Sequence, residues 1–104
     1  MLERSGSMVE NLEKYAETLK VIAHPIRLQI LMMLKDNEKL CVCEMLPRIG
    51  ISQPNLSQHL SMMRLSGLVE TEKKGNMVFY KLSDNRFLKE FLDLIDKYIN
   101  AEVK

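Results

Sequence analysis

The chain has 104 residues, of which 46% are apolar and 28% are charged, so it is long enough for one domain with a single core. This composition is typical of a globular protein and argues against intrinsic disorder. No apolar run approaches the roughly 18 residues of a membrane span, and no secretory signal is visible, so we expect a cytoplasmic protein with no membrane partner. Because the net charge is only +1, any binding to nucleic acid must depend on where charges lie.

The N-terminal half is predicted to be helical. Residues 1–7 are expected to be a disordered N-terminal segment or an expression scar, because Met8 reads naturally as a start, and residues 8–104 to form one domain. Residues 9–23 carry apolar side chains at helical spacing, which predicts an amphipathic helix. His24 and Pro25 interrupt it, and Pro25 suits the first turn of a second helix over 25–35. That second helix is apolar nearly all round, which predicts a central, buried position.

Two further helices are predicted around a short turn that contains Gly50. The first carries Val42, Met45, Leu46 and Ile49 at helical spacing, and it should begin near Cys43 or Glu44 so that Pro47 stays close to its start. Two helices joined in this way form a helix-turn-helix.

The second of the pair, over about 52–66, has clear ends. Ser52 can cap its start, Pro54 falls in its first turn, and Gly67 suits a left-handed end. Its apolar stripe consists of Leu56, Leu60 and Met63.

The C-terminal third changes character. Strand-forming residues over 68–82 flank the cluster Lys73-Lys74-Gly75-Asn76, which predicts a β-hairpin with a basic tip. Asp84 is expected to cap a last helix that runs to about residue 101. The apolar arc of that helix is wider than one small domain needs to cover, and it comprises Phe87, Phe91, Leu94, Ile95 and Tyr98, widened by Leu88, Leu92 and Ile99. The predicted fold is therefore mainly α with a β-hairpin wing, a winged helix-turn-helix in the order α-α-α-α-β-β-α.

The helix over 52–66 carries an unusual set of exposed groups. Outside its apolar stripe, nearly every side chain is an uncharged donor or acceptor, whereas an ordinary solvated helix would carry more Lys and Glu. Side chains of this kind read base edges in the major groove of DNA, and basic side chains at the wing suit phosphates. The candidate DNA-binding residues are Ser52, Gln53, Asn55, Ser57, Gln58, His59, Arg64, Lys73, Lys74 and Asn76.

Other interpretations of these residues remain open. The helix could be an ordinary polar surface, and the domain could bind only another protein. His59 lies beside the apolar stripe, so its spacing fits a packed imidazole about as well as a phosphate donor, and His24 is expected to cap or pack at the helix junction. An enzyme is not expected, since no paired acids, nucleophile–base set or glycine-rich phosphate loop is present.

Cys41 and Cys43, the two cysteines, are only one residue apart, so they form no disulfide framework. In a regular helix they would point about 200° apart, but on extended or fraying backbone they would share a side. Paired thiolates there suit soft or borderline ions such as zinc, Cu(I) or thiophilic metalloids. Two alternatives remain open: a redox or persulfide sensor, although so short a disulfide should be strained, and inert buried thiols.

Together these motifs resemble the ArsR/SmtB family of metal-responsive repressors over roughly residues 9–100. The resemblance rests on residues 24–31 (HPIRLQIL), 40–45 (LCVCEM), 52–60 (SQPNLSQHL) and 66–69 (SGLV). It implies a transcriptional repressor that thiophilic ions such as arsenite, antimonite, zinc or cadmium release from DNA by binding at Cys41 and Cys43. Arsenic- and antimony-responsive members use a third cysteine at the position of Leu46, so two protein thiols here would need an exogenous thiol or a ligand from a partner chain. A second family site uses Asp and His on the last helix, which has no histidine in this chain.

The surplus apolar surface predicts self-association. We expect a homodimer through the first and last helices, with two recognition helices entering successive major grooves of a palindromic double-stranded operator.

Overall fold

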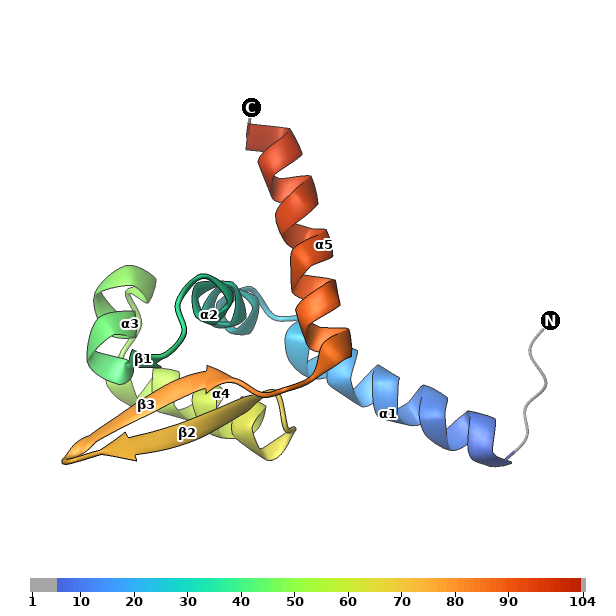
Figure 1. The fold of residues 1–104 in the computed structure, drawn as a ribbon, viewed down its shortest axis with the longest axis horizontal. Coiled ribbons are helices and arrows are strands. Elements are labelled where there is room, and N and C mark those ends of the chain that lie inside the picture. The colour runs from blue at the N-terminus through green and yellow to red at the C-terminus, as the bar shows by residue number, and fades with distance from the viewer. Residues whose placement is uncertain (1–5, 104) are drawn as a thin grey trace.

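The computed structural model describes residues 6–103, and it confirms the predicted winged helix-turn-helix. The elements follow the predicted order with one addition, a short strand before the third helix (Figure 1). In chain order they are α1 (Gly6–Ile22), α2 (Pro25–Asp36), β1 (Leu40–Cys41), α3 (Val42–Ile49), α4 (Gln53–Leu65), β2 (Val69–Lys74), β3 (Met77–Leu82) and α5 (Arg86–Val103).

The core lies between α2, α4, the sheet and the first half of α5. Ile30 and Leu31 of α2 are fully buried, which confirms the central position predicted for this helix. Leu56, Leu60 and Met63 of α4 are likewise fully buried, as their spacing predicted. By contrast, α1 and the second half of α5 project away from this body (Figure 1).

Local capping explains where α4 begins and ends. Ser52 Oγ accepts a hydrogen bond from the backbone N–H of Asn55 at 3.2 Å, as predicted for an N-cap. At the other end Gly67 has φ +75°, and the N–H of Leu68 donates to the carbonyl of Met63 at 2.9 Å. This pattern is a Schellman motif, which requires a left-handed residue and so favours glycine.

The hairpin turns at a two-residue loop, Gly75-Asn76, because Lys74 pairs with Met77 across it. Gly75 has φ +60°, as the first central position of a type II′ turn requires. The turn is thus narrower than the four-residue cluster expected from the sequence, and Lys73 and Lys74 lie on β2 itself.

A third strand, β1, was not predicted. Leu40 and Cys41 pair with Tyr80 and Phe79 of β3, so the sheet has the order β1-β3-β2. Two residues carry no readable alternation, and only the arrival of β3 from a distant part of the chain gives this segment a strand partner.

The start of α5 differs from the prediction. Asn85, not Asp84, caps it: Asn85 Oδ1 accepts from the N–H of Leu88 at 3.0 Å, and the helix begins at Arg86. Asp84 lies one residue too early for this role, and its carboxylate pairs with Lys89 at 3.3 Å.

The start of α1 also differs. The helix begins at Gly6, so residues 6 and 7 are helical although the sequence assigned them to a disordered segment or scar. Residues 1–5, the rest of that segment, lie outside the described residues.

Candidate DNA-binding surface and dithiol site

The outer face of α4 presents the side chains that the sequence singled out. Gln53, Asn55, Ser57, Gln58 and Arg64 are all exposed, while the opposite face of the helix is buried. The helix begins just after the turn at Gly50, whose φ of +75° reverses the chain at the end of α3. The structure therefore exposes these polar groups on the side of α4 away from the core, where Met62 and Leu65 are exposed as well. Ser52 lies at the start of the same face, although its hydroxyl oxygen already serves as the cap.

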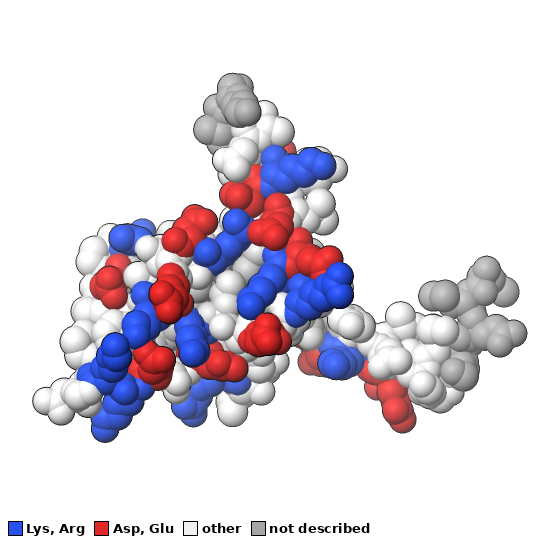
Figure 2. Space-filling model, viewed as in Figure 1, with Lys and Arg blue, Asp and Glu red and all other residues white. Residues whose placement is uncertain are grey.

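The hairpin adds positive charge near this helix. Lys73, Lys74 and Asn76 are exposed, and Figure 2 shows basic side chains gathered toward the hairpin tip. The acid nearest to them in the sheet is already paired: Glu72 accepts from Lys39 Nζ at 2.6 Å and lies 3.9 Å from Lys81 Nζ. The hydrogen bond from Lys39 lowers the pKa of Glu72. The middle of the hairpin is thus held by ion pairs, and Lys73 and Lys74, which are nearer the turn, face solvent.

His59 is the one candidate DNA contact that is not fully on the surface. Its ring is half-buried and lies 4.7 Å from the ring of His24, measured between centroids. Arg27 Nη1 is 3.4 Å from its Nδ1. His24 caps α2 as predicted, because its Nδ1 accepts from the N–H of Ile26 at 3.1 Å. Nothing in the sequence pattern linked Arg27 to α4, since Arg27 lies 32 positions before His59.

The two cysteines meet at the start of α3. Cys41 ends β1 and is buried, and its backbone N–H donates to Glu44 Oε1 at 3.0 Å. Cys43 is exposed in the first turn of the helix. Because one residue is extended and the other helical, their side chains are not held on opposite sides of one helix, and the sulfurs are joined as a disulfide with the Cα atoms 5.3 Å apart. A redox-sensing pair was one of the alternatives that the sequence left open, and the bonded arrangement is compatible with it.

As reduced thiols, the pair would supply two soft donors to one ion. No third ligand completes a metal site: among the described residues, no group of three or more His, Cys, Asp or Glu side chains is placed to hold an ion. At the position of the family's third cysteine stands Leu46, which packs against the core. The donor set therefore fits a thiophilic ion only with a ligand from outside the chain.

Apolar side chains remain uncovered on the two projecting helices. They are Leu12, Tyr15 and Leu19 of α1 and Leu94, Tyr98 and Ile99 of α5, each at least 39% exposed. Tyr15 and Phe87 pack edge to face with ring centroids 5.0 Å apart, which joins the two helices. The predicted dimer surface is therefore exposed in the single chain.

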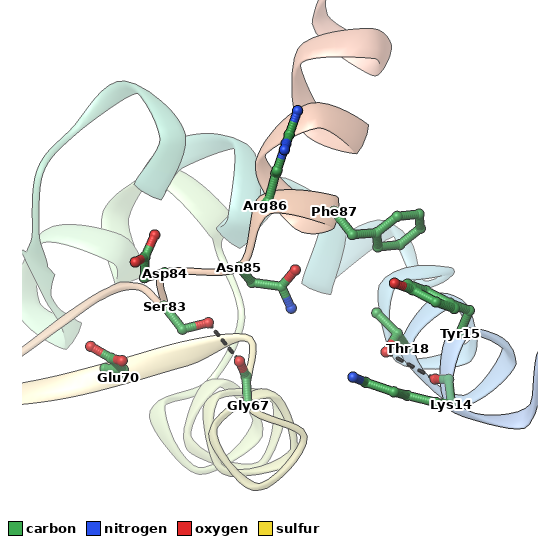
Figure 3. A pocket seen from close by; sticks show the side chains of 10 residues that line it. All are labelled: Lys14, Tyr15, Thr18, Gly67, Glu70, Ser83, Asp84, Asn85, Arg86 and Phe87. Carbon is green, nitrogen blue, oxygen red and sulfur yellow. Dashed lines mark hydrogen bonds between the residues drawn. The ribbon is translucent and has the colours of Figure 1, made fainter. Parts of the chain in front are cut away.

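A polar hollow lies where α1 meets the start of α5 (Figure 3). Lys14 and Tyr15 lie on one side of it and Asn85 on the other. Below them Ser83, a buried residue, donates through its hydroxyl to the carbonyl of Gly67. The hollow contains none of the predicted site residues, but this hydrogen bond ties the end of α4 to the segment that leads into α5.

No helix in the described part of the chain is both long enough and apolar enough to cross a membrane.

Comparisons with known proteins agree with this geometry. Residues 24–71 match the family described as bacterial regulatory protein, arsR family. The chain is 37% identical to MJ1325, an HTH-type transcriptional regulator of Methanocaldococcus jannaschii, over 86% of this chain and 99% of that protein. It is 44% identical to the transcriptional activator HlyU of Vibrio cholerae, over 86% and 82% of the two chains. The arsenical resistance operon repressor of Escherichia coli K12 is 39% identical over 64% of this chain and 57% of its own length.

A solved structure of reduced HlyU from Vibrio cholerae superposes with a TM-score of 0.82 at 41% identity, covering 90% of this chain and 97% of that one. All these relatives are named as regulators of transcription, which agrees with the expectation that this chain is not an enzyme. The chain therefore belongs to the arsR family, and it is a transcriptional regulator with a DNA-binding winged helix-turn-helix.

Proposed function

We propose that this regulator is a homodimeric repressor that reads a palindromic operator through α4. The observation that carries the proposal is the outer face of α4, where uncharged donors and acceptors are exposed beside the lysines of the hairpin. Gln53, Asn55 and Gln58 would contact base edges, because amides pair well with adenine. Ser52, Ser57, His59, Arg64, Lys73, Lys74 and Asn76 would complete the surface through phosphates and neighbouring bases.

The dimer would form through α1 and α5, because those helices carry the exposed apolar side chains. A two-fold axis between them would place the two α4 helices about 34 Å apart, one turn of DNA. A cytoplasmic site of action follows from the DNA target.

We further propose that Cys41 and Cys43 form the effector site, and that a thiophilic ion such as arsenite, antimonite, zinc or cadmium releases the operator. The position of the pair supports this coupling. Cys43 lies in the first turn of α3, which leads directly into α4, and Cys41 pairs with Phe79 in the wing. An ion that pulls on both sulfurs would thus shift two elements of the DNA-binding unit at once. The name of the arsenical resistance operon repressor adds support from a relative.

Oxidation is the second candidate effector, and the bonded sulfurs favour it. Two thiols would lose two protons and two electrons to peroxide or a polysulfide, and the resulting disulfide would lock the end of β1 to α3. A similar solved structure, that of HlyU from Vibrio cholerae, is described as reduced.

Operator binding tests the first part of the proposal. A labelled duplex that the protein selects from a random-sequence library should bind with an affinity that falls steeply as salt rises, since phosphate contacts release counterions. Affinity that does not change with salt would contradict DNA recognition and favour a protein-binding module.

The effector is tested by adding arsenite, zinc, peroxide and polysulfide separately to the reduced complex. We expect an ion to release the duplex from the wild type but not from the double variant Cys41→Ser, Cys43→Ser. Leu46→Cys is the matched variant: it restores the family's third thiol and should lower the arsenite concentration needed for release. If only peroxide or polysulfide releases the duplex, the redox candidate replaces the metal candidate, and release from the double variant would refute both.

A further inference from the structure

The side chains of His24, Arg27 and His59 join the α1–α2 junction to α4, the helix that we propose reads DNA. Arg27 lies in the first turn of α2, and its guanidinium contacts both α1 and α4. Its Nε donates to the carbonyl of Val21 in α1, and its Nη1 lies 3.4 Å from Nδ1 of His59 in α4. The tilted ring of His24 covers another side of the imidazole at a centroid distance of 4.7 Å. The contact partners of His59 therefore come from outside the helix-turn-helix.

The chemistry of this contact selects one form of His59. A guanidinium has only N–H donors and cannot accept a hydrogen bond. The 3.4 Å contact is therefore a hydrogen bond only if Nδ1 of His59 is the acceptor and carries no proton. In a neutral imidazole the proton then resides on Nε2, the nitrogen that faces away from Arg27.

The surroundings also disfavour a charged His59. Burial lowers the pKa of His59, and the nearby His24 and Arg27 lower it further. The groups that face the ring are thus one fixed cation and one second imidazole, with no carboxylate among the residues that shift its titration. Protonation at Nδ1 would set two donors against each other and break the contact with Arg27.

We infer that Arg27 is a positioning residue for DNA binding, which holds His59 as the neutral tautomer with its proton on Nε2 so that this N–H donates to an operator phosphate. The inference rests on the proposed function, because it assigns the atom of α4 that makes the contact. It also gives Arg27, a residue distant from α4 in sequence, a role in recognition. A histidine that contacts phosphate in the usual way gains affinity as it becomes charged, whereas this one does not.

The tautomer can be measured without DNA. In ¹⁵N-labelled wild-type protein near neutral pH, long-range proton–nitrogen correlations should show His59 with a protonated Nε2 and a bare Nδ1. Arg27→Met should shift His59 toward a mixture of tautomers, and the matched control Arg86→Met should not, because Arg86 is an exposed residue on α5. A wild-type His59 that carries its proton on Nδ1, or on both nitrogens, would overturn the inference even if Arg27→Met fails to fold.

Two substitutions then test the phosphate contact. The amide nitrogen of Gln can occupy the place of Nε2, whereas the shorter Asn mimics only the Nδ1 side of the ring. His59→Gln should therefore keep affinity for the selected duplex close to that of the wild type, and His59→Asn should reduce it about tenfold, the cost of one hydrogen bond to a charged group. Equal reductions in both variants would overturn the inference and leave the proposed function standing. A wild-type protein that binds no duplex would overturn the proposed function, and with it the phosphate contact.

Discussion

Single residues with special backbone or donor properties set the geometry of the DNA-binding unit. Gly50 is the clearest example, because its left-handed backbone ends α3 and turns the chain toward α4. Its N–H also donates to the carbonyl of Leu46 at 3.0 Å. No atom lies within 4 Å of the position that a Cβ would occupy, so space does not exclude a side chain. Backbone conformation alone makes glycine the favoured residue here.

Gly50→Ala should therefore lower the free energy of unfolding by about 1 kcal/mol, the cost of placing an L-residue in the left-handed region. Gly6→Ala is the matched control, because Gly6 begins α1 without a positive φ and also has open space around it. Urea denaturation followed by circular dichroism measures both. Equal stability of Gly50→Ala and the wild type would show that the turn relaxes to another conformation.

His59 gives a second prediction at this scale. Its pKa lies below the ordinary value of 6.5 because of burial and the nearby His24 and Arg27, so the unfolded chain binds its proton more readily than the folded one. The stability that the neutral ring contributes is present above pH 6.5 and is lost as the pH falls through the lowered folded pKa. Wild-type protein should thus lose stability relative to His59→Gln as the pH falls from above 6.5 to well below it in denaturant titrations. A constant difference between the two proteins across this range would contradict the lowered pKa.

At the scale of elements, the proposed function would divide recognition between α4 and the hairpin. The helix presents uncharged hydrogen-bonding groups, whereas Lys73 and Lys74 lie on an exposed strand near the turn. Groups of the first kind discriminate bases, and those of the second kind bind phosphates of any sequence. The Lys39–Glu72 pair braces the strand that carries both lysines.

Lys73→Ala and Lys74→Ala should each weaken binding to all duplexes alike, and each should reduce the slope of log affinity against log salt by about 1, because one phosphate is no longer neutralised. The comparison requires the same duplex over a series of salt concentrations. Lys20→Ala, an exposed lysine on α1, should leave the slope unchanged. A selective effect on one base sequence would instead mean that the hairpin reads bases.

For the whole molecule, the exposed apolar side chains of α1 and α5 form the surface that the proposed dimer would cover. Only Ile22 of α1 is buried, and α5 contributes Leu88 and Leu92 to the core while Leu94 and Tyr98 stay exposed. Lys35 of α2 pairs with Asp93 and Asp96 at 3.3 and 3.4 Å, which holds α5 against the body. The outward face of α5 is thus presented in a fixed orientation.

Leu94→Glu should convert the dimer to a monomer in sedimentation velocity experiments, because it places a charge within an apolar interface. Met62→Glu on α4 is the matched control, since Met62 is 45% exposed and Leu94 is 50% exposed. The control should remain dimeric. If both variants sediment like the wild type, α5 does not form the interface.

The order of elements, the caps at Ser52 and Gly67 and the stripe of α4 could all be predicted from the sequence. These features depend on the spacing of apolar residues and on residues within one helical turn of each other, so residues close in sequence are enough to specify them. The exposure of the polar side chains of α4 followed directly, because they lie outside the stripe, as do the exposed Met62 and Leu65.

Only the tertiary structure decided how distant segments meet. The strand β1 exists because β3 returns beside it, and Cys41 is extended while Cys43 is helical because that strand ends where α3 begins. Likewise the contact between Arg27 and His59 joins residues 32 apart. Such contacts arise from the packing of elements against a shared core, and the periodicity of any one segment carries no information about the side chains that another segment will place beside it.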